Sequence, residues 1–126
     1  MQSKDGYARL LVYEKAYKAA LAIYRLTETF PKEERKGIGD QMRRASISIP
    51  LNIAEGYAKR ESQQEFRRFL KMAIGSANEM SVLIEFAKDL SYIDEEKRER
   101  ASGEYEEIGK MLNGLIKKLS EKPMPK

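Results

Sequence analysis

The stretch Ser62–Leu90, SQQEFRRFLKMAIGSANEMSVLIEFAKDL, decides the fold. It opens with Ser62 and Glu65 in the spacing of a capping box, in which two side chains satisfy free backbone N–H groups at a helix start. Apolar residues then recur every three or four positions, which is the spacing of one helix face. They are Phe66, Phe69, Leu70, Ala73, Ala77, Met80, Leu83, Ile84, Ala87 and Leu90. The pattern predicts one helix of roughly 28 residues, about 40 Å long, and Gly75 at its middle predicts a close helix crossing.

Three further segments around this stretch show the same periodicity. The first run ends at Phe30-Pro31 and consists of Leu10, Tyr13, Tyr17, Ala20, Tyr24 and Thr27. The second run consists of Ile38, Met42, Ala45, Ile49 and Ile53. The last follows the acidic start Asp94-Glu95-Glu96 and consists of Tyr105, Ile108, Met111 or Leu112, Leu115 and Leu119. Because the connectors are short, we expect antiparallel neighbours.

These segments predict an all-α fold, an antiparallel up-down four-helix bundle. Pro50 lies inside the second apolar run, where it removes a backbone donor and crowds the carbonyl of Ser46, so we expect a kink in that helix. The hydroxyls of Ser46 and Ser48 are candidates to satisfy the freed groups. We expect one domain over residues 1–126, with its core at about 11–119 and a flexible C-terminal tail at 120–126.

The composition argues against catalysis and metal binding. The chain of 126 residues contains no Cys and no His, the commonest ligands of protein zinc, and His is also the commonest general base. We therefore expect no enzyme, no metal and no cofactor. The N-terminal residues do not resemble a signal peptide, and no run is apolar enough for a membrane span, so a cytoplasmic protein is expected.

Charge is unevenly distributed along the chain, although the net charge is only +4. Residues 35–71 contain nine Lys or Arg against four Asp or Glu, whereas residues 72–110 contain five against ten. The candidate nucleic-acid-binding residues are the cations of the basic stretch: Arg43, Arg44, Lys59, Arg60, Arg67, Arg68 and Lys71. Such a cluster can hold phosphates. The alternative is a solvated face whose cations pair locally with Asp40, Glu61 and Glu65.

One string of residues is more specific than any periodicity. It is Gln41–Gly56, QMRRASISIPLNIAEG, with FPKEE at 30–34 before it and EFRRFL at 65–70 and GKMLNGLI at 109–116 after it. With these motifs the chain resembles the four-helix-bundle proteins encoded in intervening sequences of bacterial 23S ribosomal RNA. The resemblance covers roughly residues 11–119.

The resemblance implies an antiparallel four-helix bundle that assembles as a homopentameric barrel, with no established enzymatic activity. The wider superfamily includes the accessory variability protein of diversity-generating retroelements, which partners a reverse transcriptase and binds nucleic acid through a basic surface. By position, that role passes to Arg43, Arg44, Lys59, Arg60, Arg67 and Arg68. Many members have Ser or Thr where this chain has Gly39, which implies a weaker cap on its second helix.

Three functions agree with these observations. The first is a non-enzymatic, oligomeric accessory protein that binds RNA or DNA through its basic surface. The second is an adaptor for another protein, with a reverse transcriptase as the leading partner. The third is a purely structural oligomer, in which the basic stretch of one copy pairs with the acidic stretch of the next. The tyrosine stripe of the first run, Tyr13, Tyr17 and Tyr24, is expected in the core or in a subunit interface.

Overall fold

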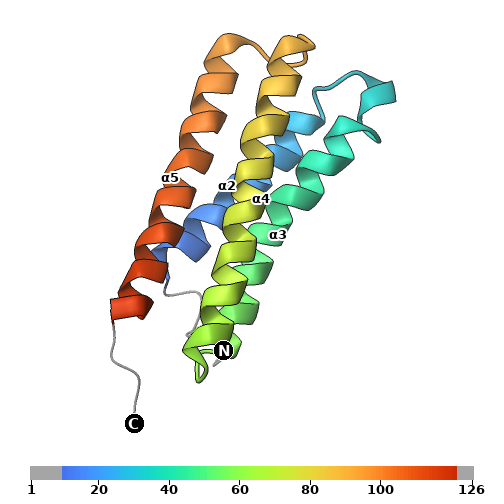
Figure 1. Cartoon of the computed structure of the whole chain (residues 1–126). Coiled ribbons are helices and arrows are strands. Elements are labelled where there is room, and N and C mark those ends of the chain that lie inside the picture. The colour runs from blue at the N-terminus through green and yellow to red at the C-terminus, as the bar shows by residue number, and fades with distance from the viewer. Residues whose placement is uncertain (1–9, 122–126) are drawn as a thin grey trace.

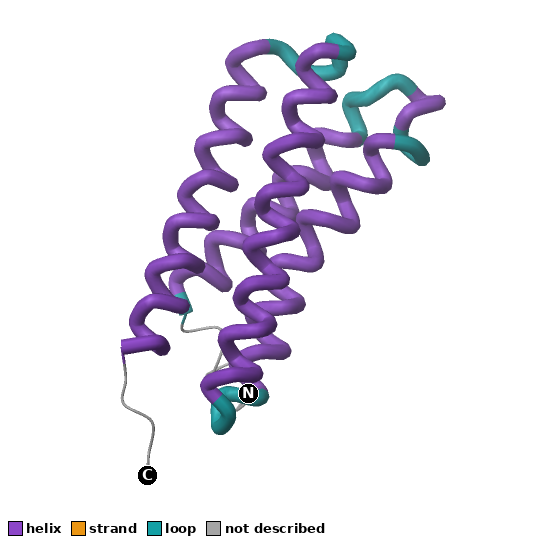
Figure 2. The backbone as a smooth tube through the Cα atoms, viewed as in Figure 1, coloured by secondary structure: helices purple, strands orange, loops and turns teal. Residues whose placement is uncertain are grey.

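The computed structural model describes residues 10–121, and the regular structure within that range is helical. Four α-helices follow one another, with one 3-10 turn between the first two. The elements are α2 (Leu11–Thr27), η1 (Lys32–Glu34), α3 (Ile38–Ala58), α4 (Gln63–Asp89) and α5 (Glu95–Glu121). Short loops connect them (Figure 2).

The helices form the predicted up-down bundle. Each helix packs on its neighbours in the chain, and α2 also contacts α5, which closes the ring of four. The chain runs up and down through successive helices, so neighbours are antiparallel (Figure 1). Since α2 and α4 share no comparable contact, they lie diagonally opposite each other across the core. The long helices α4 and α5 extend well beyond the start of α2 (Figure 1).

The core follows the predicted stripes of α3, α4 and α5 closely. Met42, Ile49 and Ile53 of α3 are fully buried, as are Leu70 and Ile84 of α4. The capping box is confirmed as well, because the backbone N–H of Glu65 donates a hydrogen bond of 3.1 Å to the Ser62 hydroxyl. Burial of these faces is the main stabilising contribution to the bundle.

The predicted stripe of α2 is only partly right. Ala20 and Thr27 are buried as expected, but Tyr17 and Tyr24 are exposed. The buried residues are mostly small: Val12, Ala16, Ala19, Ala20, Ile23 and Thr27. The larger aromatic side chains gave the stronger periodic signal, whereas the alanines that form much of the buried face gave a weak one. The tyrosine stripe is therefore largely on the outside, apart from Tyr13, which packs against the core.

α3 is one continuous helix across Pro50, and the kink expected there stays a prediction. The two nearby hydroxyls do not bind the carbonyl of Ser46 that Pro50 leaves without a donor. The Ser46 hydroxyl donates to the carbonyl of Arg43 at 2.9 Å, and that of Ser48 donates to the carbonyl of Ala45 at 2.8 Å. Ser48 also bonds the hydroxyl of Ser76, which ties α3 to α4.

The last helix extends further toward the C-terminus than predicted. α5 continues through residues 120 and 121, where the flexible tail was predicted to begin. The rest of that predicted tail, residues 122–126, lies outside the described residues. None of the helices within residues 10–121 is long and apolar enough to cross a membrane.

Candidate nucleic-acid interface

The structure divides the seven predicted cations between two places. Arg43 and Arg44 lie in the second turn of α3, whereas the other five lie around the turn between α3 and α4. Sixteen residues of α3 separate Arg43 from Lys59, which corresponds to about 24 Å at 1.5 Å per residue. The bundle therefore brings five of the seven together and leaves two at the other end.

Arg43 is engaged in holding the protein together. Its guanidinium donates hydrogen bonds to the Thr27 hydroxyl at 2.8 Å and to the Arg35 carbonyl at 2.6 Å. It also pairs with the carboxylate of Asp40 and lies over the ring of Tyr24. Its side chain is only 20% exposed. Arg44 beside it is exposed and forms no ion pair within the described part of the chain.

The turn between α3 and α4 presents two cations that have local partners. Lys59 pairs with Glu55 one turn earlier in α3, at 3.5 Å. The guanidinium of Arg60 stacks over the ring of Tyr57, 4.0 Å from its centre, and also donates to the Tyr57 carbonyl. Stacking fixes the plane of the guanidinium and leaves most of its donors facing away from the ring.

Arg68 forms the strongest of the local pairs. Two of its nitrogens donate to the two oxygens of Glu65, at 3.2 and 3.0 Å, and the guanidinium lies over the ring of Phe69. The hydrogen bond from Arg68 lowers the pKa of Glu65, so this carboxylate stays ionised near neutral pH. Exposed pairs of this kind are weak, and a phosphate can compete for the arginine.

Arg67 and Lys71 have no ion pair within residues 10–121. Lys71 is exposed, one turn after Arg67. The Nε of Arg67 and the Oε1 of Gln63 are both buried and have no hydrogen-bond partner. A buried polar atom without a partner is unfavourable. Arg67 is therefore the cation of the cluster that gains most from an added acceptor.

Two further cations lie in this cluster, and neither was predicted from the sequence. The ion pairs Arg98–Glu85 and Lys88–Glu95 fix the antiparallel register of α4 and α5. In this register the last turns of α5, which contain Lys117 and Lys118, come level with the first turn of α4. Both are exposed and form no ion pair among the described residues. The predicted up-down order was sufficient to place them, because it puts the end of the fourth helix beside the turn between the second and third helices.

We call this region the basic end. It consists of Lys59, Arg60, Arg67, Arg68, Lys71, Lys117 and Lys118. Among the residues whose side chains the structure describes, three carboxylates lie in the same region, Glu55, Glu61 and Glu65, so the seven cations leave a surplus of four positive charges there. A surplus of one sign over a surface raises the local concentration of anions and their rate of association. Within residues 10–121, no acidic cluster is arranged to hold a metal ion.

Comparisons with known proteins agree with the fold. A family model described as "23S rRNA-intervening sequence protein" matches residues 8–114. Among solved structures, the chain is similar to the crystal structure of a protein with unknown function from the S23 ribosomal protein family of Bacteroides thetaiotaomicron VPI-5482. The two chains are 29% identical, with a TM-score of 0.78, and the match covers 85% of this chain and 96% of that one. A comparison with curated proteins found no match.

Proposed function

The chain belongs to the 23S rRNA-intervening sequence protein family, and from that premise we propose that it is a non-enzymatic accessory protein that binds RNA or DNA at its basic end. The observation that carries the proposal is the convergence of seven cations on one end of the bundle, from the turn between α3 and α4, from α4 and from α5. Contacts between these side chains and phosphates account for affinity without reading bases.

The local partners of the cations support binding that is strong at low salt and weakly specific. Arg67, Lys71, Lys117 and Lys118 form no ion pair with a described carboxylate, whereas Lys59 and Arg68 must release Glu55 and Glu65 before they bind a phosphate. The first four therefore provide most of the binding energy in the proposal. Each phosphate neutralised releases counterions and steepens the dependence of affinity on salt.

We further propose that the protein works as a homo-oligomer, with five copies by resemblance to its family. Two apolar faces support this. One is the α2 face, formed by Tyr17, Leu21 and Tyr24, and the other is the α4 face, formed by Val82, Phe86 and Leu90. Because α2 and α4 lie diagonally opposite, these faces point in different directions. Bundles joined side by side through them place their basic ends on one rim, which multiplies the charge that a polyanion meets.

The experiment that tests nucleic-acid binding uses two charge-reversal variants with the same change in net charge. Lys71→Glu/Lys117→Glu removes two unpaired cations of the basic end. Lys32→Glu/Lys36→Glu is the control, because both residues are exposed and lie at the other end of the bundle. Affinity for a single-stranded RNA, and for a DNA duplex of equal length, is measured by fluorescence anisotropy at about 50 and about 200 mM NaCl.

We expect the wild-type protein to bind at the lower salt concentration and to lose affinity steeply at the higher one. The variant of the basic end is expected to bind about tenfold more weakly or worse, with a salt slope reduced by about one per lysine. The control is expected to bind as the wild type does. Absence of affinity for both nucleic acids at low salt would overturn the proposal, and so would equal losses in the two variants. If the basic-end variant still bound nucleic acid but no longer bound an acidic protein partner, such as a reverse transcriptase, the adaptor function would be favoured.

A further inference from the structure

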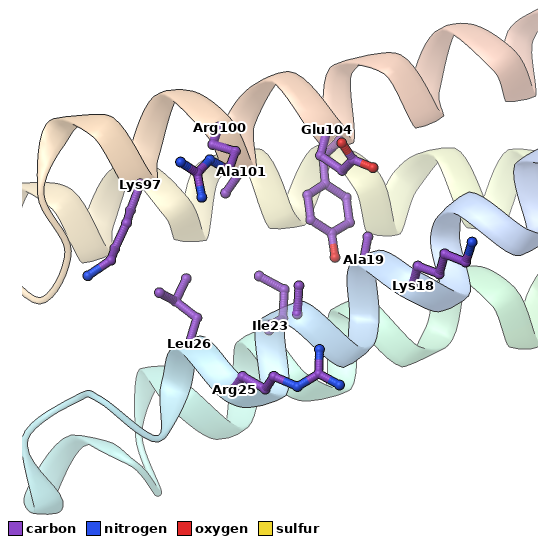
Figure 3. A pocket seen from close by; sticks show the side chains of 11 residues that line it. Lys18, Ala19, Ile23, Arg25, Leu26, Lys97, Arg100, Ala101 and Glu104 are labelled. Carbon is purple, nitrogen blue, oxygen red and sulfur yellow. The ribbon is translucent and has the colours of Figure 1, made fainter.

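The contact between α2 and α5 is the sparsest of the four contacts that close the bundle. Between these helices lies a groove of about 470 Å³ (Figure 3). This volume is within the range of sites that hold small molecules. The groove is far from the basic end, because it is lined by the first turns of α5 and the second half of α2. It is independent of the proposed nucleic-acid function.

The floor of the groove is apolar. It is formed by Ala19, Ala22, Ile23 and Leu26 of α2 and by Ala101 of α5. Ile23 and Leu26 extend from α2 toward α5 (Figure 3). The small alanine side chains on both helices leave space that larger residues fill elsewhere in the core. A flat apolar molecule gains contact with both helices in this space.

One polar group of the groove has no hydrogen-bond partner among residues 10–121. Tyr105 lines it and is 2% exposed, and its hydroxyl forms no hydrogen bond. Burial, together with the nearby carboxylate of Glu104, raises the pKa of this hydroxyl, so it keeps its proton and remains a donor. Buried hydroxyls in folded proteins normally have a partner, and this one points to an acceptor supplied by a ligand.

The rim of the groove is cationic. Lys18 and Arg25 of α2 and Lys97 and Arg100 of α5 line it, against the single carboxylate of Glu104. Glu104 is already paired with Lys15 at 3.1 Å. Lys18 and Arg100 have partners on their own helices, Glu14 and Glu96. Arg25 and Lys97 form no ion pair within the described residues. Their side chains do not converge: Lys97 extends from α5 at the Leu26 end of the groove, whereas Arg25 runs along α2 on the side away from α5 (Figure 3). Lys97 is therefore the cation available to an anion at the mouth.

We propose that the groove between α2 and α5 binds a small aryl carboxylate that has a second oxygen at its far end. Its ring lies on the alanine floor, its carboxylate meets Lys97 at the rim, and its second oxygen accepts a hydrogen bond from Tyr105. Each of the three parts of the ligand is complementary to one feature of the groove. The apolar area alone would also accept a neutral ring. The unpartnered hydroxyl and the cationic rim select an aryl carboxylate with a second oxygen.

Three probes separate these contributions. 6-Hydroxy-2-naphthoate carries all three parts, 2-naphthoate lacks the second oxygen, and 2-naphthol lacks the charge. Isothermal titration calorimetry on the full chain is expected to give saturable binding of the first probe with a Kd of about 1 mM or below, from the usual affinity per non-hydrogen atom. 2-Naphthoate is expected to bind about fivefold more weakly, and 2-naphthol more weakly still.

Four variants assign the contacts. Tyr105→Phe is expected to weaken 6-hydroxy-2-naphthoate about fivefold and to leave 2-naphthoate unchanged, which a merely structural role of the hydroxyl would not do. Lys97→Gln is expected to weaken both carboxylates but not 2-naphthol. Lys110→Gln, an exposed lysine of the same helix outside the groove, is its control. Ala22→Phe is expected to abolish binding of every probe by filling the space, while the thermal midpoint stays within a few degrees because Ala22 is exposed.

Two results would overturn the proposal. One is the absence of saturable binding of 6-hydroxy-2-naphthoate, whether or not Ala22→Phe changes the size of the particle in solution. A change in size without binding would show that a second copy covers the groove. The other is equal binding of 2-naphthol and 2-naphthoate, which would show that the cations of the rim have no part in recognition.

Discussion

Gly56 lies where α3 approaches α4 most closely. A Cβ built on it would lie 2.8 Å from the Cβ of Phe69 and 3.2 Å from the carbonyl oxygen of Phe66. Its φ is not positive, so the glycine is required by space and not by an unusual backbone angle. Gly75 is the opposite case. The sequence predicted a close crossing there, but nothing outside its own helix lies within 4 Å of an added Cβ.

We therefore expect opposite effects of the same substitution at these two glycines. Gly56→Ala should destabilise the protein by about 1–3 kcal/mol, because a backbone carbonyl and a rigid Cβ must move. Gly75→Ala should stabilise it by about 0.5–1 kcal/mol through helix propensity alone. Urea unfolding of the two variants measures both free energies. Equal signs would contradict the assignment of Gly56 to the helix contact.

Ser91 has a left-handed backbone, with φ of 66°. It ends α4 in the pattern in which the N–H of Tyr92 bonds the carbonyl of Ala87 and the N–H of Ser91 bonds that of Lys88. A residue with a Cβ pays a steric cost of about 1–2 kcal/mol in this conformation. This left-handed end of α4 could not be predicted from the sequence, since serine is not the residue usually found at such a position.

Ser91→Gly is therefore expected to raise the free energy of unfolding by roughly 0.5–1 kcal/mol, after the greater freedom of glycine in the unfolded chain is subtracted. Ser81→Gly, in the middle of α4, provides the control and should lower it by a similar amount. Thermal unfolding followed by circular dichroism is sufficient. A loss of stability in both variants would refute this account of the turn.

At the scale of elements, the joint between α2 and α3 depends on one side chain. The guanidinium of Arg43 reaches the end of α2 at Thr27, the carbonyl of Arg35 in the connector, and Asp40 in its own helix. Within residues 10–121, these three groups have no other hydrogen bond across the joint. Planar guanidinium groups can serve several acceptors at once, which an ammonium on a flexible chain does less well.

Replacing Arg43 by alanine is expected to cost about 2–3 kcal/mol, because charge-assisted hydrogen bonds at a mostly buried site are lost. Arg43→Lys should recover only part of this loss. Arg44→Ala, at the exposed neighbouring position, should stay within about 0.5 kcal/mol of the wild type. Chemical denaturation compares the three variants. If the two alanine variants lose equal stability, the joint does not depend on Arg43.

Most elements could be predicted from sequence because most of their periodic apolar residues are buried. This holds for α3, α4 and α5, where Ile49, Met80 and Leu112 are fully buried, although Leu90 at the end of the predicted α4 stripe is exposed. It failed for α2, where burial belongs to alanines and the aromatic residues remain outside. Periodicity identifies a hydrophobic face, but it does not tell a core face from a face that another molecule covers.

At the scale of the whole molecule, the candidate interface depends on packing that no local pattern shows. Lys117 and Lys118 are more than fifty residues away from the turn between α3 and α4, and only the antiparallel register places them beside it. The length of α3 separates Arg43 and Arg44 from the other cations. The basic residues could be identified from the sequence, while the bundle determines which of them lie at one end of the molecule.

The two apolar faces of the bundle make a prediction about assembly. If the α2 face of one copy docks on the α4 face of the next, the contact is heterologous, and it forms a ring when the rotation between successive copies closes. Leu21→Glu in the α2 face and Phe86→Glu in the α4 face should then each give monomers in sedimentation velocity at micromolar concentration. Leu51→Glu, on α3, changes an exposed leucine outside both faces and is the control; it should keep the size of the wild type.

Mixing the two variants distinguishes this arrangement from a two-fold one. Each Leu21→Glu copy keeps a functional α4 face, and each Phe86→Glu copy keeps a functional α2 face. An equimolar mixture should therefore form dimers of one copy of each and nothing larger, since no further intact pair of faces remains. In a two-fold interface of α2 with α2, by contrast, Phe86→Glu alone would still dimerise, because its α2 face is intact. Sedimentation of each variant alone and of the mixture thus decides how the faces pair, and a ring is compatible only with the first result.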